Sequence, residues 1–229
     1  MTPKLREKLL SAYQDLRVAD VRDAMDVVSL HGQGSMDRTI VPLVRTRAFG
    51  IAVTARYLPY RGERPPEGTR EYKKWTGRYY AEICRYPWVD ALQNGDFAVI
   101  DCSGVDAGLL GSDNTLGCIR RGCRGFASNA GVRDTDEIIL QKVPFWTARI
   151  CQSMVQARLA YESHGLPVAV GGVQIVPGDV VVADGDGVIV VPQDKAEAVA
   201  RHALAEHERD KVNRRKHYQA LGRKLDDTV

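Results

Sequence analysis

Residues 172–192 read Gly-Val-Gln-Ile-Val-Pro-Gly-Asp-Val-Val-Val-Ala-Asp-Gly-Asp-Gly-Val-Ile-Val-Val-Pro. Three short runs rich in β-branched residues, 172–176, 180–184 and 187–192, are separated by Pro-Gly-Asp and Asp-Gly-Asp-Gly. β-Branched residues favour strands, while Gly, Pro and Asp favour tight turns, so the pattern predicts three strands in sequence. The acidic turn at 184–187 resembles a calcium loop only superficially, because the spacing and final Glu of an EF-hand are missing.

The same residue preferences predict further strands and helices in the rest of the chain. Strands are predicted at 47–56, where Gly50 indicates a bulge or a close backbone approach, and at 97–102, 144–149 and 166–170. Apolar residues at helical spacing predict helices over 5–13 and 18–25, and a long helix over 193–222. No linker or internal repeat divides the chain. We therefore expect one α/β domain over residues 1–229, with a β-rich core between N- and C-terminal helices.

Composition narrows the class of protein. The 229 residues are 44% hydrophobic and 27% charged, which is typical of a folded globular chain. A net charge of +3 gives little support to nucleic-acid binding. No apolar run reaches the ~20 residues of a membrane span, and no signal peptide is recognisable at the N-terminus, so we expect a cytoplasmic protein. The cysteines form no CxxC pair and no zinc-like cluster, and are predicted to be reduced and mostly buried: Cys84, Cys102, Cys118, Cys123 and Cys151.

Residues 57–88 differ in composition from their surroundings. Pro and Gly punctuate a run rich in Arg, Lys, Tyr and Trp, which reads as an irregular insertion. Aromatic residues between basic ones can stack on nucleic acid, but in a nearly neutral chain they fit better a subunit contact or the mouth of an active site. A helix over 77–84 would point Tyr79, Tyr80 and Ile83 inward.

A glycine-rich segment, residues 103–115, follows the predicted strand at 97–102. Such a loop at the start of a helix can leave backbone N–H groups free to bind a carboxylate or phosphate. An ordinary capped turn explains the same residues, because Ser, Asp and Asn are favoured helix caps. The segment matches neither GxGxxG nor a P-loop, so it gives no support to a nucleotide site.

The chemically richest stretch is Asn129-Ala-Gly-Val-Arg-Asp-Thr-Asp-Glu137. If a helix begins at Thr135, Asp134 lies near its cap and Glu137 lies three residues further, so both carboxylates can face one side. Arg133 could hold an anion, and the two carboxylates a hard divalent metal. The structural alternative is an acidic first helical turn beside a surface ion pair.

The chain resembles the RraA-like family in three segments that occur in the family's order: residues 18–24, 50–54 and 171–192. That family includes the metal-dependent aldolases of 4-hydroxy-4-methyl-2-oxoglutarate and 4-carboxy-4-hydroxy-2-oxoadipate, and the regulator of ribonuclease activity A. In the aldolases a glycine is followed after about twenty residues by Arg-Asp, two residues and an acid. Arg133, Asp134 and Glu137 match the second half of that pattern. Glu137 favours the aldolases over the regulator, which lacks the final acid.

The resemblance implies a swivelling-domain-like fold and specific residue roles. Asp134 would bind Mg²⁺ or Mn²⁺ directly, Glu137 would hold metal-bound water, and Arg133 would contact the oxygen of a pyruvate enolate. The substrate carboxylate would lie against the turn formed by Gly111, Ser112, Asp113, Asn114 and Thr115. A neighbouring subunit could add an acid from the C-terminal helix, with Glu206 or Glu208 as weak candidates. The implied protein is a homotrimer or dimer of trimers that cleaves a 4-hydroxy-2-oxo diacid or decarboxylates oxaloacetate.

Three departures from the family pattern keep other functions open. Between Gly111 and Arg133 lie 21 residues, so Ser112 stands where the glycine is expected. Asn129-Ala130-Gly131 replaces the usual Asp-Gly-Gly or Asp-Gly-Ala, and the 57–88 segment is longer than usual. A non-catalytic regulator that binds a ribonuclease and a related sugar-acid lyase or dehydratase are the alternatives.

Overall fold

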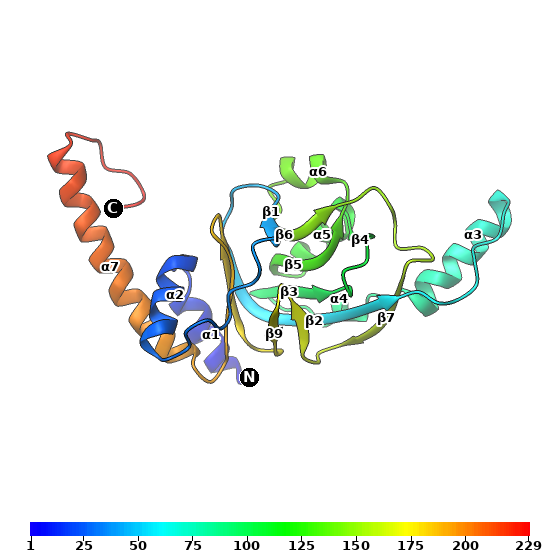
Figure 1. Cartoon of the computed structure of the whole chain (residues 1–229), viewed down its shortest axis with the longest axis horizontal. Coiled ribbons are helices and arrows are strands. Elements are labelled where there is room, and N and C mark those ends of the chain that lie inside the picture. The colour runs from blue at the N-terminus through cyan, green and yellow to red at the C-terminus, as the bar shows by residue number, and fades with distance from the viewer.

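A nine-stranded sheet, folded into a nearly closed barrel, forms the centre of the computed structural model, which describes every residue from Met1 to Val229 (Figure 1). Its strands are β1 (Val41–Pro42), β2 (Ala48–Pro59), β3 (Asp96–Asp101), β4 (Gly108–Leu110), β5 (Cys123–Val132), β6 (Phe145–Ile150), β7 (Leu159–His164), β10 (Val180–Asp184) and β11 (Gly187–Val191). Strands β8 (Val168–Val170) and β9 (Val173–Ile175) form a separate antiparallel pair. The helices are α1 (Pro3–Ala12), α2 (Val18–Val27), α3 (Thr69–Arg78), the π-helix η1 (Tyr79–Ile83), α4 (Pro87–Asp90), α5 (Ser112–Arg120), α6 (Thr135–Leu140) and α7 (Ala196–Ala220).

The middle of the sheet is parallel. Strands β2, β3, β5 and β6 are parallel neighbours in that order, and β4 also pairs with β5 in parallel. Parallel neighbours need crossover connections, and each crossover here carries helices: α3, η1 and α4 before β3, α5 before β5, and α6 before β6. All six residues of β3 are buried, as expected for a strand covered on both faces. The carboxyl ends of β4 and β5 therefore lie at the same edge of the sheet.

The C-terminal strands match the sequence prediction. β10 and β11 form a hairpin across the 184–187 turn, and Asp184 Oδ1 accepts a hydrogen bond of 2.8 Å from the Asp186 N–H. Asp184 thus stabilises the turn, which is the interpretation that the sequence favours over a calcium-binding loop. β10 also pairs with β2, so the last strands join the first long one. A Cβ on Gly50 would lie 2.6 Å from the Gly95 carbonyl oxygen, so Gly50 marks a close backbone approach, and the irregularity of β2 falls later, at Arg56–Tyr57.

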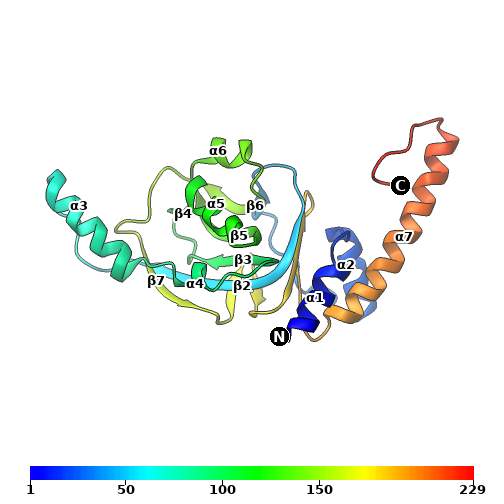
Figure 2. The ribbon, with the colours of Figure 1, turned by 180° about the vertical axis from the view of Figure 1, so that it is seen from behind.

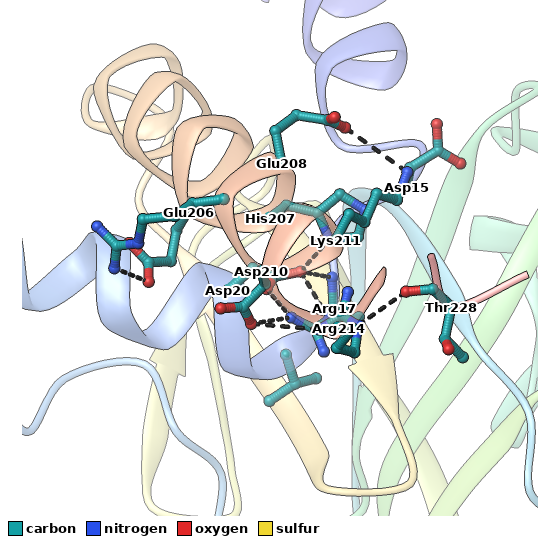
Figure 3. A network of polar contacts seen from close by, with 12 residues as sticks. Asp15, Arg17, Asp20, Glu206, His207, Glu208, Asp210, Lys211, Arg214 and Thr228 are labelled. Atoms are coloured by element: carbon teal, nitrogen blue, oxygen red, sulfur yellow. Dashed lines mark hydrogen bonds and ion pairs between the residues drawn. The ribbon is translucent and has the colours of Figure 1, made fainter. Parts of the chain in front are cut away.

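The terminal helices pack together at one end of the barrel. α7 lies against α1 and α2 (Figures 1 and 2), and its buried side is made by residues 196, 199, 200, 203 and 207. At its centre the Asp20 carboxylate, 1% exposed, accepts hydrogen bonds from the Arg17 side chain and backbone and lies 2.9 Å from His207 Nδ1 (Figure 3). Ala205, also on the early turns of α7, is exposed.

Residues 69–83, called the arm below, project from the opposite end of the molecule to α7 (Figures 1 and 2). The segment that reads as irregular in sequence thus contains ordered helix. Tyr79 is fully buried, and its hydroxyl donates to the carbonyl oxygens of Val155 and Leu159. Tyr80 is 36% exposed, so the prediction that it points inward is wrong. The hydrogen bond from the Cys84 N–H to the Tyr79 carbonyl oxygen spans five residues, and this π-helical turn shifts side chains away from the ordinary helical spacing.

The five cysteines are all free and buried, as predicted. Burial raises the pKa of the Cys84 and Cys118 thiols to about 12 and that of Cys123 to about 11. No helix of the chain combines the length and apolarity that crossing a bilayer requires.

Candidate active site

The predicted site residues gather where β4 and β5 end. Gly108 of β4 pairs with Gly131 of β5, and the Arg133 N–H extends the ladder to the Leu110 carbonyl oxygen at 3.3 Å. Immediately after β4 the chain enters α5, and two residues after β5 it enters α6. Two helix beginnings are thus held beside each other by strand pairing. Ligands in sheets of this kind bind outside the carboxyl ends of the parallel strands.

Asp134 is held in an unusual conformation at this edge. It is the residue before α6, as predicted, and its φ of 56° and ψ of 40° place it in the left-handed region. A non-glycine residue in that region costs roughly 1–3 kcal/mol, and such residues concentrate at functional sites. One carboxylate oxygen accepts a hydrogen bond of 3.2 Å from the Ser112 N–H, and the other lies 3.2 Å from Arg133 Nε. The backbone thus aims the carboxylate at the start of α5.

Two glycines permit this close approach. A Cβ on Gly111 would lie 2.1 Å from Asp134 Oδ2, and a Cβ on Gly108 would lie 2.8 Å from Arg133 Cγ. The backbone angles of Gly111 suit any residue, so the restriction there is purely steric. Gly111 is therefore the glycine that corresponds to the one in the family pattern. Its separation from Arg133 is one residue longer than in that pattern.

A cavity of about 150 Å³ opens between these elements, and we call it the Arg133 cavity. Its lining includes five predicted residues, Gly111, Asp113, Asn114, Arg133 and Asp134. The remaining lining residues, which the sequence reading did not identify, are Tyr80, Tyr86, Gly108, Leu109, Met154 and Val155. Arg133 and Asp134 are each about one-third exposed, so a small solute can reach both side chains.

Three predicted residues lie outside the cavity lining. The Thr115 hydroxyl donates to carbonyl oxygens of its own helix, Gly111 at 3.1 Å and Ser112 at 2.9 Å, so it braces the first turn of α5. Ser112 contributes its N–H to Asp134. Glu137 lies one helical turn after Asp134 on α6 with an exposed side chain.

The start of α5 is suited to an anion. Thr115 N–H bonds to the Gly111 carbonyl oxygen and Ser112 N–H to Asp134, whereas the N–H groups of Asp113 and Asn114 have no partner in the chain. Free N–H groups at a helix start, with the positive end of the helix dipole, favour carboxylate or phosphate. The 111–115 turn is therefore a candidate carboxylate site.

The side chains also fit a hard divalent cation. No group of three or more His, Cys, Asp or Glu side chains gathers anywhere in the chain. Mg²⁺ is commonly bound by only one or two carboxylates with several waters. Asp134 supplies one oriented, solvent-accessible carboxylate, and Glu137 lies three residues further along the chain, on α6, with an exposed side chain. Carboxylate and water ligands suit Mg²⁺ and Mn²⁺ alike.

Two phenols, Tyr80 and Tyr86, contribute uncharged groups to the cavity lining. Burial raises the pKa of Tyr86, whose hydroxyl donates to the Leu109 carbonyl oxygen at 3.0 Å. Burial also raises the pKa of Tyr80, and the nearby Cys84 thiol adds to that rise while the Arg133 charge opposes it. Both phenols are therefore protonated near neutral pH.

Comparison with known proteins agrees with the resemblance seen in the sequence. The family model RraA-like, described as Aldolase/RraA, matches residues 18–190. Legionella pneumophila protein DlpA is 27% identical over 205 residues, 89% of this chain and 30% of DlpA. A Halalkalibacterium halodurans protein, named as a candidate 4-hydroxy-4-methyl-2-oxoglutarate aldolase, is 30% identical over 122 residues, 53% of this chain and 58% of that protein. The chain thus spans less than two thirds of either relative.

Solved structures share the fold. Streptomyces coelicolor RraAS2, described as an unusual member of the RNase ES inhibitor RraA protein family, superposes with a TM-score of 0.71 at 24% identity, over 90% of this chain and 96% of that one. An uncharacterized protein from Pseudomonas syringae pv. tomato superposes with a TM-score of 0.74 at 24% identity, over 97% and 96% of the two chains. At these identities the likeness establishes the fold alone.

Proposed function

The chain belongs to the RraA-like family, and on that premise we propose that it is a divalent-metal-dependent lyase that releases pyruvate from 2-oxo acids. The observation that carries the proposal is the Arg133–Asp134 pair, held by a left-handed Asp134 beside the free N–H groups at the start of α5. A protein that worked only through surface contacts would have no need of this strained, cavity-facing pair. The aldolase activity in a relative's name supports the same class.

The proposed reaction breaks the C3–C4 bond of a 4-hydroxy-2-oxo acid. The 4-hydroxyl loses its proton, C4 becomes a carbonyl carbon, and the bond electrons pass to C3 and the 2-oxo oxygen as pyruvate enolate. Protonation at C3 then gives pyruvate. Oxaloacetate would lose CO₂ from C4 and reach the same enolate, so one site can serve both reactions.

Each residue of the site has a task in this scheme. The Asp113 and Asn114 N–H groups bind the C1 carboxylate, which places the 2-oxo oxygen toward Arg133. Arg133 donates to that oxygen as negative charge develops on it, and a fixed donor so placed stabilises the transition state more than the ground state. Asp134, with water held by Glu137, would bind Mg²⁺ or Mn²⁺, which when bound supplies Lewis-acid polarisation of the substrate oxygens.

Arg133→Ala tests this assignment. We expect the rate of pyruvate release to fall by about 10²–10³-fold, the usual loss for one donor to a developing oxyanion. Arg133→Lys should recover part of the rate, because it keeps the charge but not the planar fork. Arg201→Ala, which removes an exposed and unpaired arginine on α7, is the matched control. Equal activity in Arg133→Ala and Arg201→Ala would refute the proposal.

A further inference from the structure

The arm contributes an aromatic residue to the Arg133 cavity. Tyr80 of η1 lines the cavity beside Met154 and Val155. Its neighbour Tyr79 anchors η1, because the Tyr79 hydroxyl bonds the Val155 carbonyl oxygen and its ring stacks on Trp75 at a centroid distance of 5.0 Å. Single π-helical turns are frequent at functional sites. The arm therefore holds Tyr80 in place against the site.

The charges around the cavity are unequally distributed. Arg133 is the single cation among the lining residues, and the proposed chemistry uses it at the 2-oxo oxygen. The other charged lining residues are the carboxylates Asp113 and Asp134. A second substrate carboxylate would therefore find no further cationic side chain in this cavity and would meet Asp113. Burying an unpaired charge beside a like charge is strongly unfavourable.

The other lining residues of the cavity suit an uncharged group. Leu109 and Val155 are buried apolar residues, and Tyr86 has its hydroxyl engaged with the Leu109 backbone. Tyr80 adds an aromatic face and one hydroxyl. The cavity volume is about 150 Å³. Such a space fits a short acid with a small apolar end.

From this lining we infer that the substrate is a 4-hydroxy-2-oxo monocarboxylic acid with an uncharged, apolar C4 substituent, and that Tyr80 selects it over the corresponding diacid. The inference rests on the proposed lyase function and narrows its substrate class. It departs from the diacid that the family resemblance implies, and the departure follows from the arm and the missing second cation.

A neighbouring cavity supplies the rival explanation. It measures about 580 Å³, shares Tyr86, Asp113 and Asn114 with the Arg133 cavity, and is also lined by Arg120 and Arg121. Arg121 lies 3.4 Å from Asp90, whereas Arg120 is exposed and has no ion pair. A diacid long enough to reach Arg120 would be bound there through its second carboxylate, and Tyr80 would then have no effect on substrate selectivity.

The experiment measures kcat/KM for pyruvate release from two acids by the metal-loaded protein: 4-hydroxy-2-oxopentanoate and 4-hydroxy-4-methyl-2-oxoglutarate. We expect the monoacid to be preferred by at least about tenfold. Tyr80→Phe should keep that preference, since the wall stays apolar, and Tyr80→Arg should shift it at least about tenfold toward the diacid. Tyr72→Arg places the same cation on α3 outside both cavities and should change nothing.

Each outcome separates this inference from the function on which it rests. Preference for the diacid in the wild-type protein, especially one that Arg120→Ala abolishes, overturns the monoacid inference and leaves the lyase intact. Equal shifts in Tyr80→Arg and Tyr72→Arg overturn the role of Tyr80. No pyruvate from either acid or from oxaloacetate, with Mg²⁺ or Mn²⁺, overturns the lyase function itself.

Discussion

Replacing Gly111 by alanine adds a single methyl group at the point where the two halves of the site meet. The new Cβ would lie 2.1 Å from Asp134 Oδ2, whereas ordinary contacts begin near 3.4 Å, so the carboxylate and the helix start must separate by at least 3.4 − 2.1 = 1.3 Å. A displacement of about 1 Å in a catalytic group can cost about 10²-fold in rate. We therefore expect kcat/KM to fall about 100-fold, which corresponds to about 2.7 kcal/mol of transition-state stabilisation.

Stability should change far less than activity. The backbone angles at Gly111 suit alanine, so the free energy of unfolding should fall by no more than about 1 kcal/mol, the usual cost of a poorer helix cap. Gly117→Ala is the matched control, because it lies in the same helix and its Cβ would meet nothing within 4 Å. That variant should be as active as the wild-type protein and slightly more stable, since alanine restricts the unfolded chain.

The assay is pyruvate release coupled to a dehydrogenase, run beside urea denaturation on the same samples. A Gly111→Ala protein with wild-type kcat/KM would refute the claim that Asp134 works in the position seen here. A loss of activity shared by Gly117→Ala would show that α5 as a whole is sensitive, and that the contact with Asp134 is not the cause.

Other predictions concern the ion network and the thiols. Asp20→Asn should lower the free energy of unfolding by about 3–5 kcal/mol at pH 7 by breaking the buried pair with Arg17 and His207, while pyruvate release per folded molecule is unchanged. Burial raises the pKa of Asp20, but its hydrogen bonds and the charge of Arg17 lower it more, so the pKa in the folded protein lies below its usual value. The unfolded chain therefore takes up a proton at Asp20 before the folded protein does. In urea titrations at several pH values, the wild-type advantage should shrink as the pH falls below about 4. A wild-type advantage that does not shrink on acidification would contradict this account. The buried thiols have raised pKa values, so an aromatic disulfide reagent at pH 8 should label them only on unfolding, and rapid labelling of Cys84, Cys118 or Cys123 in the native protein would be inconsistent with the packing.

Much of the fold follows from local sequence patterns. The strands at 180–184 and 187–191 form because β-branched residues alternate between two buried faces, and the turn residues between them permit a hairpin. The start of α6 at Thr135 was predicted from the preference of Asp for the cap position, although the Asp134 side chain makes no capping hydrogen bond there. The pairing of Arg133 with Asp134 and their nearness to Gly111 agree with the family pattern.

The features that the sequence could not show depend on tertiary geometry. The left-handed angle of Asp134 and the pairing of β4 with β5 bring the start of α5 to the carboxylate, and neither has a local signal. Tyr80 was expected to face the core because helical periodicity assumes 3.6 residues per turn, which the π-helix of η1 breaks. Its place in the cavity could be found only from the folded arm.

Metal-dependent pyruvate release from oxaloacetate by the wild-type protein and by Asp134→Ala is the most direct test of the central claim. Both proteins would be assayed with Mg²⁺, with Mn²⁺ and with a chelator, and Mn²⁺ affinity would be measured on the same samples by calorimetry. We predict turnover that requires the metal, a loss of at least about 100-fold in Asp134→Ala, and weaker Mn²⁺ binding by that variant. Turnover that survives the chelator, or an Asp134→Ala protein with unchanged rate and affinity, would contradict the account.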